Sequence, residues 1–533
     1  MSDPDVIIVG AGSAGCVLAN RLSADPALQV LLLEAGPRDR NPLLHVPKGF
    51  GKLLAHPKLA WHFPTEPVGS ARRDEQWVRG RVLGGSSAIN GMVYNRGHAA
   101  DYDELVRSGN PGWGWAEMLP VFRAIEDHAL GASGSRGSGG PLGVSVCSSG
   151  DELCEDMLRA AGEIGLERRA DVNDSDGERI GYSPATIRGG RRVSAARAFL
   201  RPASRRPNLR VVTGVTAESL LFRGDRAVGV RARTSRGAVE FRCSREVVVS
   251  AGGLGSPVLL QRSGLGPAED LRRAGIEVRL DRPAVGGRLR EHRYVPLQFR
   301  LTADLGYNRQ LASAAAQART AVRYLRTRAG PLALPAFDIL GFLKTRRDEP
   351  RPDAQVHLAP WSVQRFEPGG EARVEDFPGV QGIGYALRPD SEGRLVVTSA
   401  DPGSRPAIDP CFLTTDHDRR ITAAVLRRMR DLFSREPIAR HLAEETVPGT
   451  AVDGDDEVVD AALNLGGCGY HAVGTCAMGP NPDDVVDARL RVRGVDGLRV
   501  VDSSAMPAML SGNLNGPVMA AAWRGADLIA EDL

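Results

Sequence analysis

Short, mostly apolar runs separated by turns of small residues open the chain. Asp5–Val9 and Val30–Glu34 are runs of strand length, which predicts two strands buried on both faces. Between them lies a glycine-rich turn over residues 10–15, followed by a helix that we expect over Cys16–Leu22. A strand, a glycine turn, a helix and a second strand in this order are typical of a parallel sheet with crossover helices.

The same pattern returns far along the chain. Leu209–Val212 and Glu246–Ser250 are further apolar runs, and the second leads through a glycine turn into a helix expected over Val258–Arg262. Gly497–Asp502 predicts one more strand, and a C-terminal helix is expected from about Pro517. These elements predict one doubly wound sheet built from distant segments.

Between about residues 296 and 460 the glycine turns become rare. Mixed apolar segments replace them, including Gln355–Trp361 and Arg394–Thr398. A change of pattern over such a length indicates a second domain.

Composition and charge narrow the class of protein. The 533 residues are 42% hydrophobic and 25% charged, which is the balance of a folded globular chain. A formal net charge of +3 predicts neither a nucleic-acid nor a membrane partner. Seven cysteines without a CxxC pair predict neither a disulfide framework nor a metal site. The sequence shows no signal-like segment and no apolar stretch of spanning length, so we expect a cytoplasmic protein.

The glycine turn carries the first chemical prediction. Gly10 permits the tight turn, Gly12 lets a pyrophosphate approach the backbone, and Gly15 lets the helix pack closely on the sheet. The helix N-terminus would offer free N–H groups to the phosphates, and Glu34 ends the second strand where it can accept bonds from a ribose hydroxyl. The turn could also serve packing alone, and by itself it would fit a nicotinamide enzyme.

Three other parts of the chain are too particular to be generic turns. Gly80–Val93 pairs glycines with serines, and Ser256–Gly266 continues the second glycine turn. The third part comprises Tyr470–Gly479, which contains His471, together with Ser511–Pro517.

These segments together resemble the glucose-methanol-choline (GMC) oxidoreductase family of FAD enzymes, and the likeness runs from Asp5 to Ile529. One position departs, because Gly253 stands where the family's second signature usually has Ala, Ser, Thr or Pro. The resemblance implies an α/β fold, α+β overall, with a Rossmann-like FAD-binding domain and a mixed-sheet substrate-binding domain. We expect the FAD-binding domain to comprise residues 1–145, 190–295 and 461–533, and the substrate-binding domain residues 146–189 and 296–460.

The resemblance also assigns the reacting groups. His471 matches the family's catalytic base, and a histidine has a pKa suited to taking an alcohol proton as hydride leaves for flavin N5. Asn513 matches a position that carries histidine or asparagine in the family. Its amide can bond the substrate oxygen but cannot act as a base, so we expect a single base. Asn513 could instead be a turn residue before a helix.

The cofactor contacts carried over from the family surround the same segments. Ile89 stands where some members carry a histidine that tethers FAD, so we expect non-covalent FAD. The helix that starts near Pro517 would direct its N–H groups at the flavin pyrimidine. Asp502 could equally be a helix cap. The expected FAD contacts are Gly10, Gly12, Ser13, Ala14, Gly15, Glu34, Ala35, Val82, Gly85, Ser86, Asn90, Gly91, Met92, Val93, Val215 (adenine edge), Asp502, Asn515, Gly516 and Pro517.

Substrate identity is open at this stage. No cluster of acids or aromatics marks a cationic alcohol such as choline, so we favour a primary alcohol, aryl or otherwise apolar, oxidised to an aldehyde. The electron acceptor is O2 or another acceptor, and oligomeric state cannot be read from the sequence. Gly469 leaves space that could ease access of oxygen or of a wide substrate, or it could be a turn glycine. Alternative functions are a lyase or photodecarboxylase of the same family, or a redox-silent FAD-binding protein. Candidate pocket aromatics are Tyr307, Phe337, Phe342, Trp361 and Phe366.

Overall fold

The computed structural model describes residues 3–148, 150–364 and 373–533. Its first layer is a parallel sheet of five strands in the order β12-β2-β1-β16-β27. Every strand predicted for this sheet is present. Their bounds are Leu209–Thr213 (β12), Val30–Glu34 (β2), Val6–Val9 (β1), Glu246–Val249 (β16) and Leu498–Val500 (β27).

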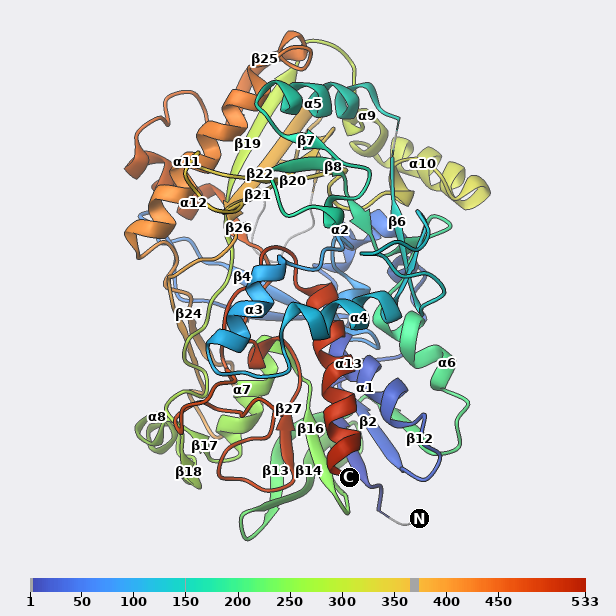
Figure 1. Ribbon diagram of the computed structural model, residues 1–533, viewed down its shortest axis with the longest axis vertical. Coiled ribbons are helices and arrows are strands. Elements are labelled where there is room, and N and C mark those ends of the chain that lie inside the picture. Colours follow the sequence, from blue (N-terminus) through green and yellow to red (C-terminus); the bar gives the residue numbers. More distant parts are fainter. Residues whose placement is uncertain (1–2, 149, 365–372) are drawn as a thin grey trace.

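Helices cover this sheet and begin at its carboxyl edge. Helix α1 (Ser13–Leu22) packs against the C-terminal helix α13 (Asn515–Asp532), and α7 (Gly252–Arg262) follows β16. Figure 1 shows α1 and α13 side by side in front of the parallel strands. The sequence placed the starts of α1, α7 and α13 two to six residues too late, because their first turns consist of small or polar residues that show no apolar period.

A second, mixed sheet forms the other half of the molecule (Figure 1), in the order β25-β19-β22-β21-β20-β8-β7, with β26 beside β19. Its neighbours are antiparallel except for β7 and β8. The bounds are Leu442–Val447 (β25), Arg293–Leu301 (β19), Gly379–Ala386 (β22), Ala354–Ala359 (β21), Ile339–Leu343 (β20), Arg179–Tyr182 (β8), Glu167–Arg168 (β7) and Gly467–Cys468 (β26).

Each sheet has its own apolar core. The strands of the parallel sheet share one buried cluster with α1 and α13, and a second cluster joins β19, β20, β21 and β22 to helix α11 (Asp416–Phe433). A Rossmann-like layer joined to a mixed sheet is the α/β, α+β architecture that the sequence predicted. The residue boundaries of the two domains stay a prediction.

Smaller elements lie around the sheets. The hairpin of β3 (Ala60–Pro64) and β4 (Gln76–Gly80) precedes the Gly80–Val93 loop, and β5 (Glu126–His128) lies beside β6 (Leu142–Val146). No helix within the described ranges combines the length and the apolar character that crossing a membrane requires.

Candidate active site

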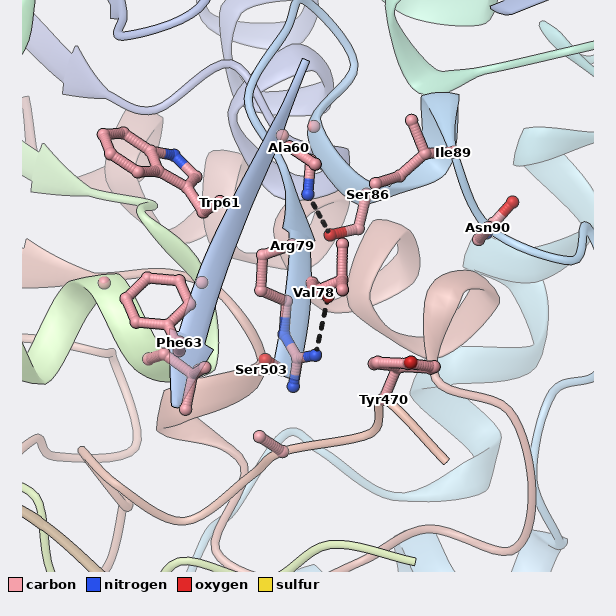
Figure 2. Close-up of a pocket in the computed structure, with 18 of the residues that line it drawn as sticks. Ala60, Trp61, Phe63, Val78, Arg79, Ser86, Ile89, Asn90, Tyr470 and Ser503 are labelled. Carbon is pink, nitrogen blue, oxygen red and sulfur yellow. Dashed lines mark hydrogen bonds between the residues drawn. The ribbon is translucent and has the colours of Figure 1, made fainter. Parts of the chain in front are cut away.

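One cavity of about 820 Å³ is lined by both sheets. Gly10 and Glu34 line it at the carboxyl ends of β1 and β2, whereas His357 and Tyr385 line it from β21 and β22. The carboxyl edge of a doubly wound sheet is where such folds bind ligands, and the volume is that of a ligand site. Figure 2 looks into the part of this cavity beside the β3–β4 hairpin.

The glycine turn makes a cradle at one end of the cavity. Gly12 is the N-cap of α1 without a side-chain capping bond, so backbone N–H groups stay available to a ligand. A Cβ placed on Gly12 would meet nothing within 4 Å, whereas one on Gly85 would lie 2.6 Å from the Gly12 Cα. The Gly80–Val93 loop therefore closes on the turn and leaves free space above Gly12. This arrangement fits the pyrophosphate of a dinucleotide.

Most of the predicted FAD contacts line this cavity. Four do not. Gly15 packs α1 against Gly10, Val82 is buried in a small apolar cluster, and Gly516 with Pro517 is buried in the first turn of α13. Those that line the cavity are Gly10, Gly12, Ser13, Ala14, Glu34, Ala35, Gly85, Ser86, Asn90, Gly91, Met92, Val93, Val215, Asp502 and Asn515.

Two of these acids also hold the backbone. Glu34 accepts bonds from the N–H groups of Ala11 (2.9 Å) and Gly36 (2.8 Å), and burial raises its pKa to about 7. Asp502 accepts from Ser504 N (2.8 Å) and Gly252 N (2.8 Å). Asp502 is thus both a helix cap and a lining residue, which are the two roles weighed from the sequence.

His471 and Asn513 meet at the other end of the cavity. The Asn513 Nδ2 lies 3.2 Å from His471 Nε2, although the two residues are 42 positions apart. Asn513 Oδ1 accepts from Asn95 Nδ2 (3.1 Å) and Gln355 Nε2 (3.1 Å). Since Oδ1 has these two donors, the Asn513 NH2 group faces His471 and can donate. The geometry brings together the two residues to which the sequence gave a chemical role.

A hydrogen-bond chain in the mixed sheet fixes that amide. Gln355 Oε1 accepts from the Tyr385 hydroxyl (2.9 Å), which leaves the Gln355 NH2 group to donate to Asn513. His357 Nε2 lies 3.0 Å from the same hydroxyl. Because each member is buried or half-buried, the chain holds the amide in one orientation.

Burial sets the charge state of the histidines. Desolvation, then the nearby His292, His357 and Arg79, hold the pKa of His471 well below its ordinary value of 6.5. Burial also lowers the pKa of His292 to about 4 and that of His357 to about 3. The imidazole of His471 is therefore neutral at neutral pH, which is the state that a base requires.

The sequence did not assign three residues that contact His471 or hold it in place. His292 Nδ1 lies 2.8 Å from His471 Nδ1, and Glu291 Oε1 accepts the backbone N–H of His471 (2.6 Å). Arg79 reaches Glu291 Oε2 (3.4 Å) and lies over the Tyr470 ring, 5.6 Å from its centre (Figure 2). The signal available was the Glu291-His292 pair inside the family-like segment that ends there.

The structure gives a reason for a glycine at position 469 that the sequence did not supply. A Cβ on Gly469 would lie 2.8 Å from His471 Nδ1 and 2.9 Å from His292 Cβ. A side chain there would separate the two histidines. The next residue, Tyr470, has a φ of 63°, a left-handed conformation that is strained for a tyrosine.

The N-termini of α1 and α13 meet at the cavity. Ser13 Oγ donates to Asn515 Oδ1 at 2.7 Å, and both residues line the cavity. Asn515 opens α13, so the N-terminal ends of two helices lie beside the same space.

Aromatic side chains line the mixed-sheet side. Phe337 and Trp361 line the cavity, and the Phe337 ring lies 5.1 Å from that of His357. Tyr307 packs with Trp361 outside the lining, Phe342 is buried in a separate cluster, and Phe366 lies outside the described residues.

Known proteins are similar to this chain over nearly its whole length. The chain is 38% identical to an alcohol dehydrogenase [acceptor] of Pseudomonas putida over 98% of its length and 95% of the relative. It is 38% identical to a mitochondrial choline dehydrogenase of Mus musculus, over 98% of this chain and 89% of the relative. A crystal structure of pyridoxine 4-oxidase from Mesorbium loti superposes with a TM-score of 0.89 at 31% identity, covering 99% of both chains.

Family models agree with these relatives. Two GMC oxidoreductase models match residues 4–294 and 389–522, which together cover most of the chain. The first match contains the glycine cradle and the second contains His471 and Asn513. The protein therefore belongs to the GMC oxidoreductase family.

Proposed function

We propose that this chain binds FAD non-covalently and oxidises a primary alcohol, aryl or otherwise apolar, to an aldehyde, with His471 as the only base. The observation that carries the proposal is the pairing of His471 Nε2 with the Asn513 amide, 3.2 Å apart, in the cavity that also contains the glycine cradle. FAD, when bound, supplies a hydride acceptor at flavin N5.

His471 and Asn513 have different roles toward the alcohol. The hydroxyl proton goes to His471 Nε2 while the Asn513 NH2 group donates to the substrate oxygen, so negative charge on that oxygen is stabilised. Because its pKa lies well below 6.5, His471 is unprotonated at neutral pH and its Nε2 lone pair is available for the proton, while burial and the positive Arg79 make it a weaker base than a free imidazole. Asn513 has no basic atom, which leaves one base.

The cavity residues support non-covalent cofactor binding. Ile89 lines the cavity at the position where a tethering histidine occurs in the family, and its side chain has no atom that could form the bond. Acid precipitation of the holoprotein should release yellow FAD into the supernatant. A flavin that stays with the pellet would overturn this part of the proposal.

The aromatic lining supports an aryl or apolar alcohol. Phe337, His357 and Tyr385 follow one another at ring distances of 5.1 and 5.7 Å, and Tyr385 lies 6.2 Å from the His471 ring. A flat substrate placed along this wall would present its hydroxymethyl group to the base.

Anaerobic flavin reduction tests the proposal. A panel of aryl, aliphatic and quaternary-ammonium alcohols is added to the holoprotein, and bleaching by an aryl or apolar alcohol is the expected result. His471→Ala should keep FAD and lose about 100- to 10,000-fold of the reduction rate, and Asn513→Ala should lose less. Bleaching by no alcohol would favour a lyase, photochemical or redox-silent protein. Air readmitted afterwards distinguishes an oxidase, whose colour returns rapidly, from a dehydrogenase.

A further inference from the structure

His292 makes two hydrogen bonds that together decide where its proton lies. Its Nε2 is 2.9 Å from the carbonyl oxygen of Leu387, just after β22, and its Nδ1 is 2.8 Å from His471 Nδ1. A carbonyl oxygen only accepts, so His292 Nε2 must carry the hydrogen. In the neutral ring, Nδ1 of His292 is then an acceptor, and the hydrogen between the two rings belongs to His471.

The opposite arrangement would require a buried cation. If His292 Nδ1 donated to His471, His292 would carry hydrogens on both nitrogens. The His292 side chain is fully buried, and burial lowers its pKa to about 4, which disfavours that state. The groups that surround the pair are His357, Tyr385 and Arg79. Two carboxylates also act on it: Glu291 accepts both backbone N–H groups, and Asp418 raises the pKa of His292 less than burial lowers it.

We infer that His292 is a positioning residue that holds His471 in the Nδ1–H tautomer, so that the lone pair of Nε2 faces the cavity and the Asn513 amide. The inference rests on the proposed function for its chemical meaning. Free imidazole side chains favour hydrogen on Nε2, the atom that must be unprotonated here, so a partner at Nδ1 changes the fraction of competent base.

Separate contacts keep the two rings together. Glu291 Oε1 accepts the backbone N–H groups of both His292 (2.9 Å) and His471 (2.6 Å). Gly469 donates its N–H to the His292 carbonyl (2.8 Å), and the absence of a Cβ at this glycine leaves room for the ring contact. The pair is thus built by the segment that directly precedes β19 and by the loop after β26, independently of any substrate.

Histidine nitrogen NMR on the FAD-loaded protein tests the tautomer directly. The protein is labelled with 15N-histidine, and His471→Ala identifies the signals of His471. Above the ordinary histidine pKa of about 6.5, we expect a protonated Nδ1 and an unprotonated Nε2 for His471. A protonated Nε2 in the unmodified protein would overturn the inference. Because no substrate is added, this result stands or falls separately from alcohol oxidation.

Two amide variants of similar shape separate positioning from packing. His292→Asn can place its carbonyl oxygen near the lost Nδ1 and accept from His471, whereas His292→Gln reaches toward Leu387 and offers no acceptor at Nδ1. We expect His292→Asn to retain the Nδ1–H tautomer and His292→Gln to shift His471 toward Nε2–H. Equal spectra for the two variants would contradict the assignment.

The kinetics of the two variants, His292→Asn and His292→Gln, give a second readout. With an alcohol that bleaches the flavin, His292→Gln should lower kcat about 10- to 100-fold with little change in KM, and His292→Asn should recover most of it. His128→Asn removes a buried histidine of β5 that does not line the cavity, and it serves as the control for burial alone. An equal loss of kcat in His128→Asn and His292→Gln would mean that His292 contributes through packing alone.

Discussion

At the scale of the residue, the pH at which His471 stops acting as a base is set by its surroundings. Its pKa lies well below 6.5 because it is buried and faces His292, His357 and Arg79. Protonation removes the base, so kcat/KM should be level through pH 6.5 and fall only at lower pH. Arg79→Gln removes one positive neighbour, which should raise the pKa of His471 and move the acid limb to higher pH. The measurement is the pH profile of kcat/KM, and an acid limb at or above 6.5 in the unmodified protein would contradict the assigned burial effect.

His357 provides a stability prediction with a definite sign. Its folded pKa of about 3 lies below the unfolded value of 6.5, so between these values the unfolded chain binds a proton that the folded protein does not. The stabilisation from the neutral ring is present above pH 6.5 and is lost as pH falls toward 3. Each pKa unit corresponds to about 1.4 kcal/mol.

Comparing the unmodified protein with His357→Gln isolates the contribution of His357 to the pH dependence of stability. Burial raises the pKa values of Glu34 and Glu291 to about 7, and raised carboxyl pKa values act in the opposite direction as pH falls. We therefore expect the free energy of unfolding to fall more steeply from pH 6.5 to 4 in the unmodified protein than in His357→Gln. Urea unfolding at each pH measures both slopes, and parallel slopes would refute the prediction.

At the scale of the element, the N-terminus of α1 contains two glycines with different reasons to be glycine, Gly12 at the N-cap and Gly15 in the first turn. A Cβ on Gly15 would lie 1.9 Å from the Gly10 carbonyl oxygen, whereas a Cβ on Gly12 would meet nothing within 4 Å. Gly15→Ala should destabilise the fold with or without FAD. Gly12→Ala should fold normally and bind FAD more weakly, because its methyl group occupies the space left for the pyrophosphate.

Thermal unfolding of the FAD-free proteins, followed by FAD titration, separates the two glycines. Gly12→Ala should unfold at the temperature of the unmodified apoprotein and show a higher Kd for FAD. A Gly12→Ala apoprotein as unstable as Gly15→Ala would mean that this glycine serves packing alone.

The elements also show how far the sequence predicts this fold. The strands β1, β2, β12 and β16 were predicted to within a residue or so, because buried parallel strands are continuous apolar runs. Helix starts were late where the first turn is Gly, Ala or Ser. The His292–His471 contact joins residues 179 positions apart in two loop segments, and no local pattern encodes such a pair. The family resemblance carried His471 and Asn513 but not the residues behind them.

At the scale of the whole molecule, the two sheets place different chemistry on the two sides of one cavity. The parallel sheet contributes the glycine cradle, and the mixed sheet contributes an aromatic wall and a neutral hydrogen-bond chain. His471 and Asn513 both come from the C-terminal segment that returns to the parallel layer after the mixed sheet is complete. A substrate bound beside His471 would therefore contact the mixed-sheet wall.

The charges that line the cavity, rather than its aromatic wall, predict discrimination against a quaternary ammonium group. Among the described residues that line the cavity, the acids are Glu34, Glu75 and Asp502, and each is already bonded: Glu34 to the glycine turn, Glu75 to Arg293, and Asp502 to Ser256. Arg79 adds positive charge near His471. A cationic alcohol would lose water without gaining an anionic partner.

Choline and its neutral isostere, in which carbon replaces the quaternary nitrogen, have nearly the same shape and differ in charge. We expect a higher kcat/KM for the isostere than for choline, and a higher value again for benzyl alcohol. Phe337→Ala should lower kcat/KM for benzyl alcohol about 10-fold or more by removing apolar contact area, and should affect a short aliphatic alcohol less. A preference for choline over the isostere would show that an anionic group or the aromatic faces of the wall bind the cation, and the aryl or apolar assignment would then be wrong even if His471 remained the base.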